Sequence, residues 1–539
     1  MRRAVGLFVA VAALVVASWW WRGADVTMPP SPLAQGERLQ CVSYAPFRDR
    51  QTPLDFTTYI PAAQIEDDLK RLAALTDCIR IYSVDVGLDQ VPEIAERHGL
   101  KVLLGIWVSN RRDRTQWQIK TGVALAKRFP NTVQALIVGN EVLLRGEITA
   151  DTLTEYLREV KAQVSQPVTY ADVWEFWMRN APLAQDVDFI TIHILPYWED
   201  HPIPAKNAAD HILSIHGQVA AAFPGREILI GEVGWPSAGR MREGALPSPA
   251  SQALVMHDLL TRTKAAHIRM NVIEAFDQPW KRQLEGTVGG HWGLITDPPR
   301  RVKFAWGQPV SNHPYWPWQA LGGVLFAALV FAAAGVAARR GGATEPSPRA
   351  WQTVAIIAAV AGATLGWTIE AAFLESLGWG GLLRSLALIL IAVGVPLASA
   401  AAIGARVGTP TFANLLGGVG HVREFRRRKP LALTLVALLA ATTVVAIQAA
   451  LGFAFNPRYL DFPFAPMTAA AVPYLLLQQH LPAATPTRAM AETAAAAVLL
   501  PCAAFIAWRE GAENWQALWF CATLAGLAIT LARAPGGRG

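Results

Sequence analysis

The segments VQALIVGNE at residues 133–141 and EILIGEVGW at residues 227–235 are built alike. Each is a short apolar run that leads to a glutamate, Glu141 in the first segment and Glu232 in the second. A carboxylate at the end of a buried strand costs desolvation free energy unless an interaction or a chemical role compensates for it. The two segments therefore predict buried strands whose glutamates serve a purpose.

Further strand-like runs alternate with helical stretches over residues 34–310. Residues 62–75 and 148–164 show helical spacing of their apolar side chains. Near-continuous apolar runs are typical of parallel strands that are buried on both faces. Eight strands that alternate with helices predict a (β/α)8 TIM barrel, and thus an α/β fold class for this domain. The eight runs are residues 41–47, 78–84, 101–108, 133–141, 167–173, 187–195, 227–235 and 270–277.

The barrel prediction gives the two glutamates a common location. Glu141 closes the fourth strand and Glu232 lies near the end of the seventh, and the carboxyl ends of barrel strands surround the active site. Two carboxyl groups there can flank one glycosidic bond, and retaining glycosidases hold such a pair about 5–5.5 Å apart. The alternative is that each glutamate only forms a salt bridge. Two glutamates on opposed strands favour catalysis.

Four motifs of this region resemble glycoside hydrolase family 17, the β-1,3-glucanases and β-1,3-glucanosyltransferases. The resemblance implies that Glu141 is the general acid/base and that Glu232 is the nucleophile. One position departs from the family pattern, because Gln278 stands where the family usually has a glutamate. The motifs are VGNE at 138–141, GEVGWPS at 231–237, FDQPWK at 276–281 and HWGLI at 291–295.

Several other side chains are candidates for substrate binding. Asn140 can form a hydrogen bond with the sugar 2-hydroxyl, a contact that strengthens in the transition state. Lys281 and Glu285 fall near a Lys/Glu pair of plant members of the family. Asp172 and His193 either position the carboxylates or form a satisfied buried polar pair. Aromatic residues near strand ends can serve as sugar platforms or as packing side chains; they are Tyr44, Tyr82, Tyr197, Trp235 and Trp280.

No cofactor is expected. The histidines are scattered, and no Cys/His spacing matches a metal site. The glycines after residue 285 follow a strand end without a helical pattern behind them, so they do not form a phosphate-binding loop.

Residues 311–539 predict an all-α transmembrane domain of about seven helices. The chain has 539 residues, of which 52% are hydrophobic and 17% charged. Its long apolar runs have roughly the 20 residues that a membrane-spanning helix requires. The run at 465–481 is short and contains Pro473. The runs are residues 317–338, 351–369, 382–403, 431–451, 465–481, 489–508 and 515–532.

Residues 1–33 contain an eighth apolar run. It fits a cleaved signal peptide or an uncleaved membrane anchor, and its three tryptophans favour the anchor, since tryptophan is enriched at membrane interfaces. Basic residues are expected on the cytoplasmic side. Alternating spans place all the basic clusters there and the barrel on the periplasmic side of the inner membrane; the clusters are Arg2–Arg3, Arg339–Arg340, Arg426–Lys429, Arg488 and Arg533 with Arg538.

The four cysteines divide between the two halves. Cys502 and Cys521 lie in apolar runs and are expected to be packing residues. Cys41 and Cys78 open the first two barrel strands. They form a disulfide in an oxidising compartment or remain two buried thiols, and the sequence leaves both alternatives open.

Two functions fit this organisation. The first is a membrane-anchored retaining enzyme that hydrolyses or transfers β-1,3-glucan outside the cytoplasmic membrane, in contact with membrane lipid and in cooperation with a separate glucan synthase. The second is a non-catalytic glucan-binding barrel in a membrane system for glucan synthesis or export. Two intact glutamates favour the enzyme. The net charge of +7 is explained by basic clusters beside membrane spans, so nucleic acid is not an expected partner.

Overall fold

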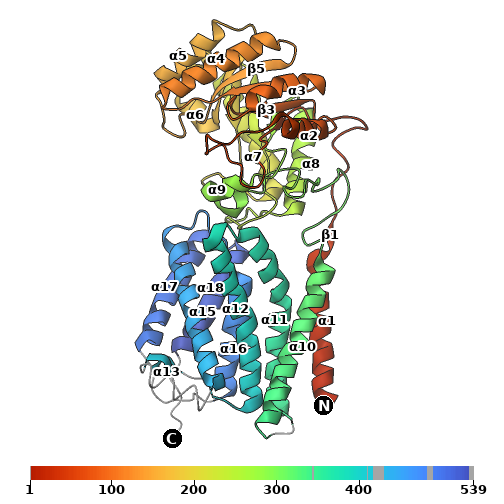
Figure 1. Ribbon diagram of the computed structural model, residues 1–539, viewed down its shortest axis with the longest axis vertical. Coiled ribbons are helices and arrows are strands. Elements are labelled where there is room, and N and C mark those ends of the chain that lie inside the picture. The colour runs from red at the N-terminus through yellow and green to blue at the C-terminus, as the bar shows by residue number, and fades with distance from the viewer. Residues whose placement is uncertain (1, 343–344, 409–410, 417–429, 482–489, 533–539) are drawn as a thin grey trace. The chain divides into compact units, whose positions relative to one another are not determined.

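The computed structural model describes residues 2–342, 345–408, 411–416, 430–481 and 490–532 (Figure 1). The chain divides into two compact units. One unit comprises Val26–Val310, and the other comprises Met1–Asp25 together with Ser311–Gly539. The amino-terminal segment therefore groups with the carboxy-terminal helices.

The unit Val26–Val310 is a closed barrel of eight parallel strands. Every strand that the sequence predicts is present, and the TIM-barrel fold is confirmed. The barrel strands are β2 (Val42–Ser43), β3 (Cys78–Ile81), β4 (Lys101–Ile106), β5 (Val133–Asn140), β6 (Val168–Val173), β7 (Ile190–His193), β8 (Ile228–Val233) and β9 (Arg269–Val272). A separate two-stranded sheet pairs β1 (Asp25–Val26) with β10 (Val310–Ser311).

Helices follow the strands of the barrel and cover them with apolar faces. Two of these helices were predicted from their spacing, and both form; in the second, the Thr149 hydroxyl caps the helix by accepting a hydrogen bond from the Thr152 backbone N–H. The α-helices are α2 (Ala62–Leu72), α3 (Val91–Arg97), α4 (Arg112–Arg128), α5 (Ala150–Lys161), α6 (Trp174–Arg179), α7 (Ala208–Ala222), α8 (Pro249–Ala265) and α9 (Arg282–Gly289).

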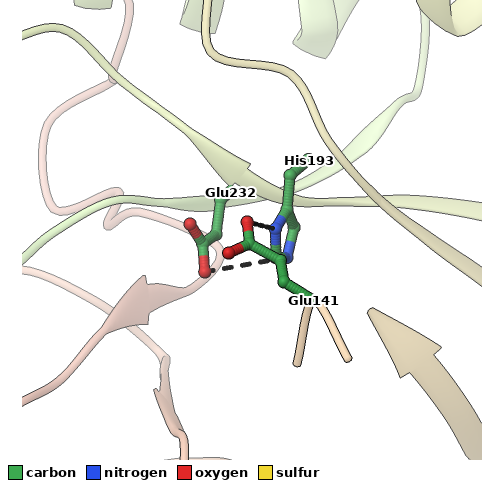
Figure 2. A group of neighbouring side chains, drawn as sticks. All are labelled: Glu141, His193 and Glu232. Carbon is green, nitrogen blue, oxygen red and sulfur yellow. Dashed lines mark hydrogen bonds and ion pairs between the residues drawn. The ribbon is translucent and has the colours of Figure 1, made fainter. Parts of the chain in front are cut away.

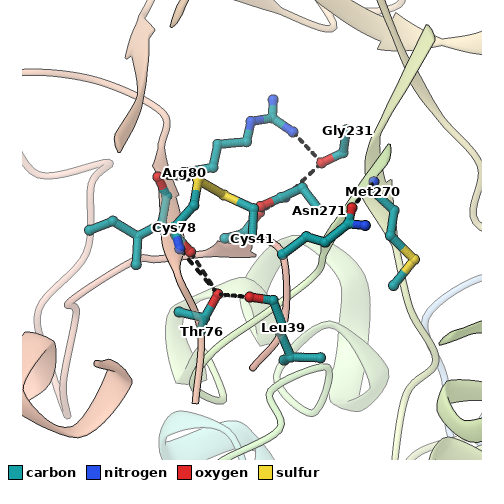
Figure 3. Close-up of a disulfide and its surroundings, with 11 residues drawn as sticks. Leu39, Cys41, Thr76, Cys78, Arg80, Gly231, Met270 and Asn271 are labelled. Atoms are coloured by element: carbon teal, nitrogen blue, oxygen red, sulfur yellow. Dashed lines mark hydrogen bonds between the residues drawn. A yellow bond between two sulfur atoms is a disulfide. The ribbon is translucent and has the colours of Figure 1, made fainter. Parts of the chain in front are cut away.

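Cys41 and Cys78 form a disulfide between the starts of the neighbouring strands β2 and β3 (Figure 3). Both residues belong to a small apolar cluster with Leu103, Ala135 and Leu229. The bond closes a loop with a sequence separation of 37 residues. By loop entropy alone, closure of such a loop stabilises the folded state by about 4 kcal/mol. Between the two alternatives that the sequence left open, the structure has the disulfide.

The other unit is a bundle of long helices. Within the described residues, seven helices are long and apolar enough to cross a membrane. They include every predicted run except 465–481, which forms the shorter helix α16 (Phe464–His480, 17 residues). The seven are α1 (Arg2–Gly23), α10 (Trp316–Arg340), α11 (Pro348–Glu375), α12 (Gly378–Ala405), α15 (Pro430–Phe455), α17 (Met490–Glu510) and α18 (Trp515–Ala532). A short helix, α13, spans Ala413–Leu416.

Helix α1 packs against α10 and α11 through a notch of small residues. Trp19 is fully buried and Val15 is 1% exposed. An added Cβ at Gly366 would lie 2.5 Å from the Trp19 ring, and one at Gly362 would lie 3.0 Å from Val15. The Arg22 guanidinium is 4.0 Å from the Trp367 ring centroid and donates a hydrogen bond to a backbone carbonyl of α11. Glycine at these positions allows α1 to approach its neighbours closely.

Candidate active site

Glu141 and Glu232 meet at the carboxyl ends of their strands (Figure 2). Together with His193 at the end of β7, each offers a polar atom within 4.8 Å of the others. Glu232 is 5% exposed, whereas the Glu141 side chain is 24% exposed. The two carboxyl groups that the sequence predicts on opposed strands are therefore neighbours.

The backbone turns sharply where β5 delivers Glu141. Gly139 has φ 86° and Glu141 itself has φ 53°, in the left-handed region that non-glycine residues rarely occupy. The Glu141 N–H donates to the Ala171 carbonyl of β6 at 2.8 Å, which holds this conformation. A left-handed residue held in place by its neighbours is characteristic of functional sites. The turn aims Glu141 at His193, whose Nδ1 lies 2.8 Å from Glu141 Oε1.

Arg80 on β3 connects the parts of this site. Its guanidinium donates to the Gly231 carbonyl at 2.7 Å, to Asn140 Oδ1 at 2.5 Å and to Glu232 Oε1 at 3.4 Å. The side chain is 1% exposed, so its charge is neutralised by Glu232 rather than by solvent. An added Cβ at Gly231 would lie 3.3 Å from both Arg80 and His193, and glycine therefore keeps this space open. Arg80 is not among the predicted site residues, although an arginine inside the apolar run CIRIYSV was a signal for it.

Tyr82 makes a second hydrogen bond to the same oxygen of Glu232 that Arg80 contacts. Its hydroxyl donates to Glu232 Oε1 at 2.9 Å and lies 2.9 Å from the Ser43 hydroxyl. Burial raises the pKa of Tyr82 well above its usual value, and the negative charge of Glu232 raises it further. Tyr82 therefore stays protonated and donates to Glu232.

The second carboxyl group lies in a different electrostatic environment. Burial alone would raise the pKa of Glu141, but the hydrogen bond from His193 and the nearby positive charges outweigh burial and lower it. Asp172 on β6 lies nearby, and burial raises its pKa to about 6. The Tyr170 hydroxyl donates to Asp172, which also accepts the Val173 backbone N–H at 2.8 Å. Asp172 thus sits in its own hydrogen-bond network beside the pair.

A third buried glutamate lies at the end of the eighth barrel strand. Glu274 is 1% exposed, and both of its carboxylate oxygens accept hydrogen bonds from Lys281 Nζ at 2.9 Å. Burial raises the pKa of Glu274 to about 7, against the effect of Lys281. Burial would lower the pKa of Lys281, but Glu274 and Glu285 outweigh it and raise it. The predicted site residues include Lys281 and Glu285 but not Glu274, which follows an apolar run as Glu141 and Glu232 do.

The five aromatic candidates separate by burial. Tyr44, Tyr197 and Trp235 are 1%, 0% and 0% exposed, and their rings are packing side chains in the structure. The Tyr44 hydroxyl donates to Asp68, and the Tyr197 hydroxyl donates to a backbone carbonyl. Tyr82 and Trp280 are half-buried and keep part of their rings accessible.

Gln278, the departure from the family pattern, is fully buried. Its amide donates to the Ala45 carbonyl at 2.9 Å and to the Phe276 carbonyl at 3.2 Å. Its carbonyl oxygen accepts the Trp280 indole N–H at 2.8 Å. Gln278 therefore supports the orientation of Trp280 within the scaffold.

The family comparison places its match on the barrel. Residues 41–293 match the family model of the BtgE/BtgC glycoside hydrolase domain. The barrel is a family 17 glycoside hydrolase domain. The chain is 24% identical over 255 residues to a glucan 1,3-beta-glucosidase of Saccharomyces cerevisiae, and the aligned region covers 43% of the chain and 81% of that protein. It is 27% identical over 253 residues to a glucan 1,3-beta-glucosidase of Candida albicans, which covers 42% of the chain and 82% of that protein.

One solved structure is also similar to the family 17 domain. It is the glycoside hydrolase family 17 beta-1,3-glucanosyltransferase of Rhizomucor miehei, with 25% sequence identity and a TM-score of 0.42. The alignment covers 50% of this chain and 97% of that one. The helical unit lies outside the range that the family model matches.

Proposed function

We propose that the protein is a retaining enzyme of β-1,3-glucan, with Glu232 as the nucleophile and Glu141 as the acid/base. The proposal rests above all on the separation of the two carboxyl groups. One carboxylate oxygen of Glu141 lies within 4.8 Å of one of Glu232. Inverting enzymes leave about 6.5–9.5 Å for a water molecule between their carboxyl groups, and retaining enzymes leave about 5–5.5 Å. The Saccharomyces and Candida relatives are glucan 1,3-beta-glucosidases, which supports β-1,3-glucan as the substrate.

The reaction proceeds in two displacements. Glu232 attacks the anomeric carbon while Glu141 transfers its proton to the departing glycosidic oxygen, which leaves a glucosyl ester on Glu232. Glu141, now ionised, then removes a proton from the acceptor hydroxyl, and the acceptor oxygen displaces Glu232. Arg80 and Tyr82 hold Glu232 in position before attack, since both donate to Oε1. A bound sugar covers the exposed quarter of the Glu141 side chain and raises its pKa by desolvation, as an acid requires.

Asn140 and Trp280 are the substrate contacts that this arrangement supports best, and Lys281 and Glu285 remain further proposed contacts. Arg80 donates to the side-chain oxygen Oδ1 of Asn140 at 2.5 Å, which directs the side-chain N–H groups away from Arg80. In our proposal these N–H groups bind the sugar 2-hydroxyl. The half-buried Trp280 ring supplies a platform for a glucosyl unit.

Product analysis of the full-length protein tests the proposed function. Purified protein in detergent is incubated with linear β-1,3-oligosaccharides, and the products are identified by mass and linkage. Shorter products alone mean that water is the acceptor, and longer or branched products mean that a second glucan chain is the acceptor. If the wild-type protein forms no product, the barrel only binds glucan, and the alternative of a synthesis or export partner replaces this proposal.

We also propose that the helical unit spans the cytoplasmic membrane and holds the family 17 domain on the outer side. Exposed tryptophan and tyrosine side chains gather at one end of the bundle, as at a membrane interface. At this end Arg384 pairs with Glu375 at 2.9 Å. The aromatic residues are Trp20, Trp21, Tyr315, Trp318, Trp379 and Trp508, and the described arginines at the opposite helix ends are Arg2, Arg3, Arg339, Arg340, Arg349 and Arg406.

Two further observations support this orientation. The disulfide Cys41–Cys78 requires an oxidising compartment, which the cytoplasm is not. The close packing of α1 against α10 and α11 supports an uncleaved anchor over a removed signal peptide, because removal would expose the notch that buries Trp19.

The basic clusters Arg426–Lys429, Arg488 and Arg533 with Arg538 lie outside the described residues. Membrane lipid and a separate glucan synthase remain proposed partners.

Reporter fusions test the topology. We expect a reporter enzyme that is active only in the periplasm to be active when fused after Val310 and silent when fused after Gly539. The second expectation depends on α16, because this helix makes the number of spans even. An active reporter at Gly539 would mean that α16 does not cross the membrane. A silent reporter after Val310 would place the family 17 domain in the cytoplasm and contradict the proposed orientation.

A further inference from the structure

His193 is buried between the two catalytic candidates and takes no part in the proposed bond changes. Its side chain is 0% exposed and lies at the end of β7 (Figure 2). Nδ1 is 2.8 Å from Glu141 Oε1, and Nε2 is 3.6 Å from Glu232 Oε1. Nε2 is also 3.3 Å from the guanidinium nitrogen Nη1 of Arg80. One imidazole ring thus contacts the acid/base, the nucleophile and the buried guanidinium.

Arg80 determines which ring nitrogen carries the proton. A guanidinium only donates hydrogen bonds and does not lose its proton in proteins. Arg80 Nη1 lies at 3.3 Å from Nε2, nearer than Glu232 Oε1 at 3.6 Å, and the shorter contact requires Nε2 to present its lone pair to the guanidinium. The single proton of a neutral imidazole then lies on Nδ1. It is donated to Glu141 Oε1.

We propose that His193 is a positioning residue that confines the catalytic proton of Glu141 to Oε2. This inference rests on the proposed function. Because the Nδ1–H occupies Oε1, a protonated Glu141 carries its proton on the other oxygen. In the first displacement that proton moves from Oε2 to the leaving oxygen, and in the second Oε2 takes a proton from the acceptor hydroxyl. His193 stays neutral throughout and transfers no proton.

The surroundings of the Glu141–His193 pair contain other charges that act on the same equilibrium. Arg80 and Glu232 face the imidazole from β3 and β8. Asp172 on β6 and Arg145, which follows Glu141, act on the Glu141 carboxyl by charge. These groups remain in place when His193 is replaced, so a change in the pH profile of a His193 variant reports the lost hydrogen bond. Two titratable tyrosines also face these charges: the Tyr82 hydroxyl donates to Glu232, and the Tyr170 hydroxyl donates to Asp172.

The test compares His193→Ala, His193→Gln and the strand control Ile192→Ala in the full-length protein. Loss of a hydrogen bond to an ionised acceptor should raise the pKa of Glu141, so the alkaline limb of kcat/KM should move upward by about one pH unit in His193→Ala. At the wild-type optimum, kcat/KM on β-1,3-oligosaccharides should fall about 10- to 100-fold. A dinitrophenyl glucoside substrate needs no acid, so its glycosylation rate should stay close to that of the wild type. The Gln variant, which retains an N–H donor, should keep the alkaline limb near its original position.

The control and a measurement without variants make the inference falsifiable. Ile192→Ala removes more core packing from the same strand, and we expect it to lower stability without moving the alkaline limb. An unmoved limb in His193→Ala, or an equal movement in Ile192→Ala, would overturn the inference. In wild-type protein, the nitrogen-15 resonances of the imidazole next to Arg80 should show a neutral ring protonated on Nδ1 over the active pH range. An imidazolium or an Nε2–H tautomer would also overturn it, whereas a wild type that forms no product would reject the proposed function instead.

Discussion

Glu232→Gln should abolish turnover of β-1,3-glucan, with a loss in kcat of about 10⁵-fold or more, because an amide cannot form the glucosyl ester. The variant should fold, since its amide oxygen still accepts hydrogen bonds from Tyr82 and Arg80, which now donate to Glu232 Oε1. The measurement is the rate of product formation from linear β-1,3-oligosaccharides by full-length protein in detergent.

Glu227→Gln is the matched control for this variant. Glu227 begins the same run, EILIGEVGW, but it lies at the opposite end of β8 and pairs with Arg269 on the surface. We expect wild-type turnover from it. Comparable losses in both variants would point to damage to strand β8 rather than to a missing nucleophile, and wild-type turnover in Glu232→Gln would exclude Glu232 from the proposed role.

The barrel was predictable because its signals are local. Short apolar runs that alternate with amphipathic helices identify buried parallel strands without any knowledge of long-range contacts. The same locality made Glu141 and Glu232 visible, since each follows such a run. The disulfide was not decidable from sequence, because the distance between Cys41 and Cys78 depends on the pairing of β2 with β3.

The contacts around the glutamates depend on the closed barrel and could not be read from spacing. Arg80, His193 and Glu232 come from three different strands and meet only when the sheet closes. The same limit explains the aromatic candidates. An aromatic residue near a strand end has the same sequence signature whether it is half-buried, as Trp280 is, or fully buried in the protein interior, as Trp235 is.

Glu141→Gln should separate the two displacements. On β-1,3-oligosaccharides we expect kcat to fall about 10³- to 10⁴-fold, because the departing oxygen receives no proton. A dinitrophenyl glucoside has a leaving group that needs no acid, so it should still glycosylate Glu232. The second displacement lacks its base, and the glucosyl enzyme should therefore accumulate. A burst of about one equivalent of dinitrophenol measures this accumulation.

The trapped ester turns the acid/base variant into an assignment of the nucleophile. Proteolysis and mass spectrometry should find one glucosyl group on the peptide that contains Glu232, and azide, a nucleophile that needs no base, should restore turnover. Glu155→Gln on the exposed face of α5 is the control and should behave as the wild type does. A label on another residue would reassign the nucleophile. The activated substrate requires only an intact site around Glu232. The absence of any burst, in a variant that folds, would therefore mean that Glu141 does more than transfer protons.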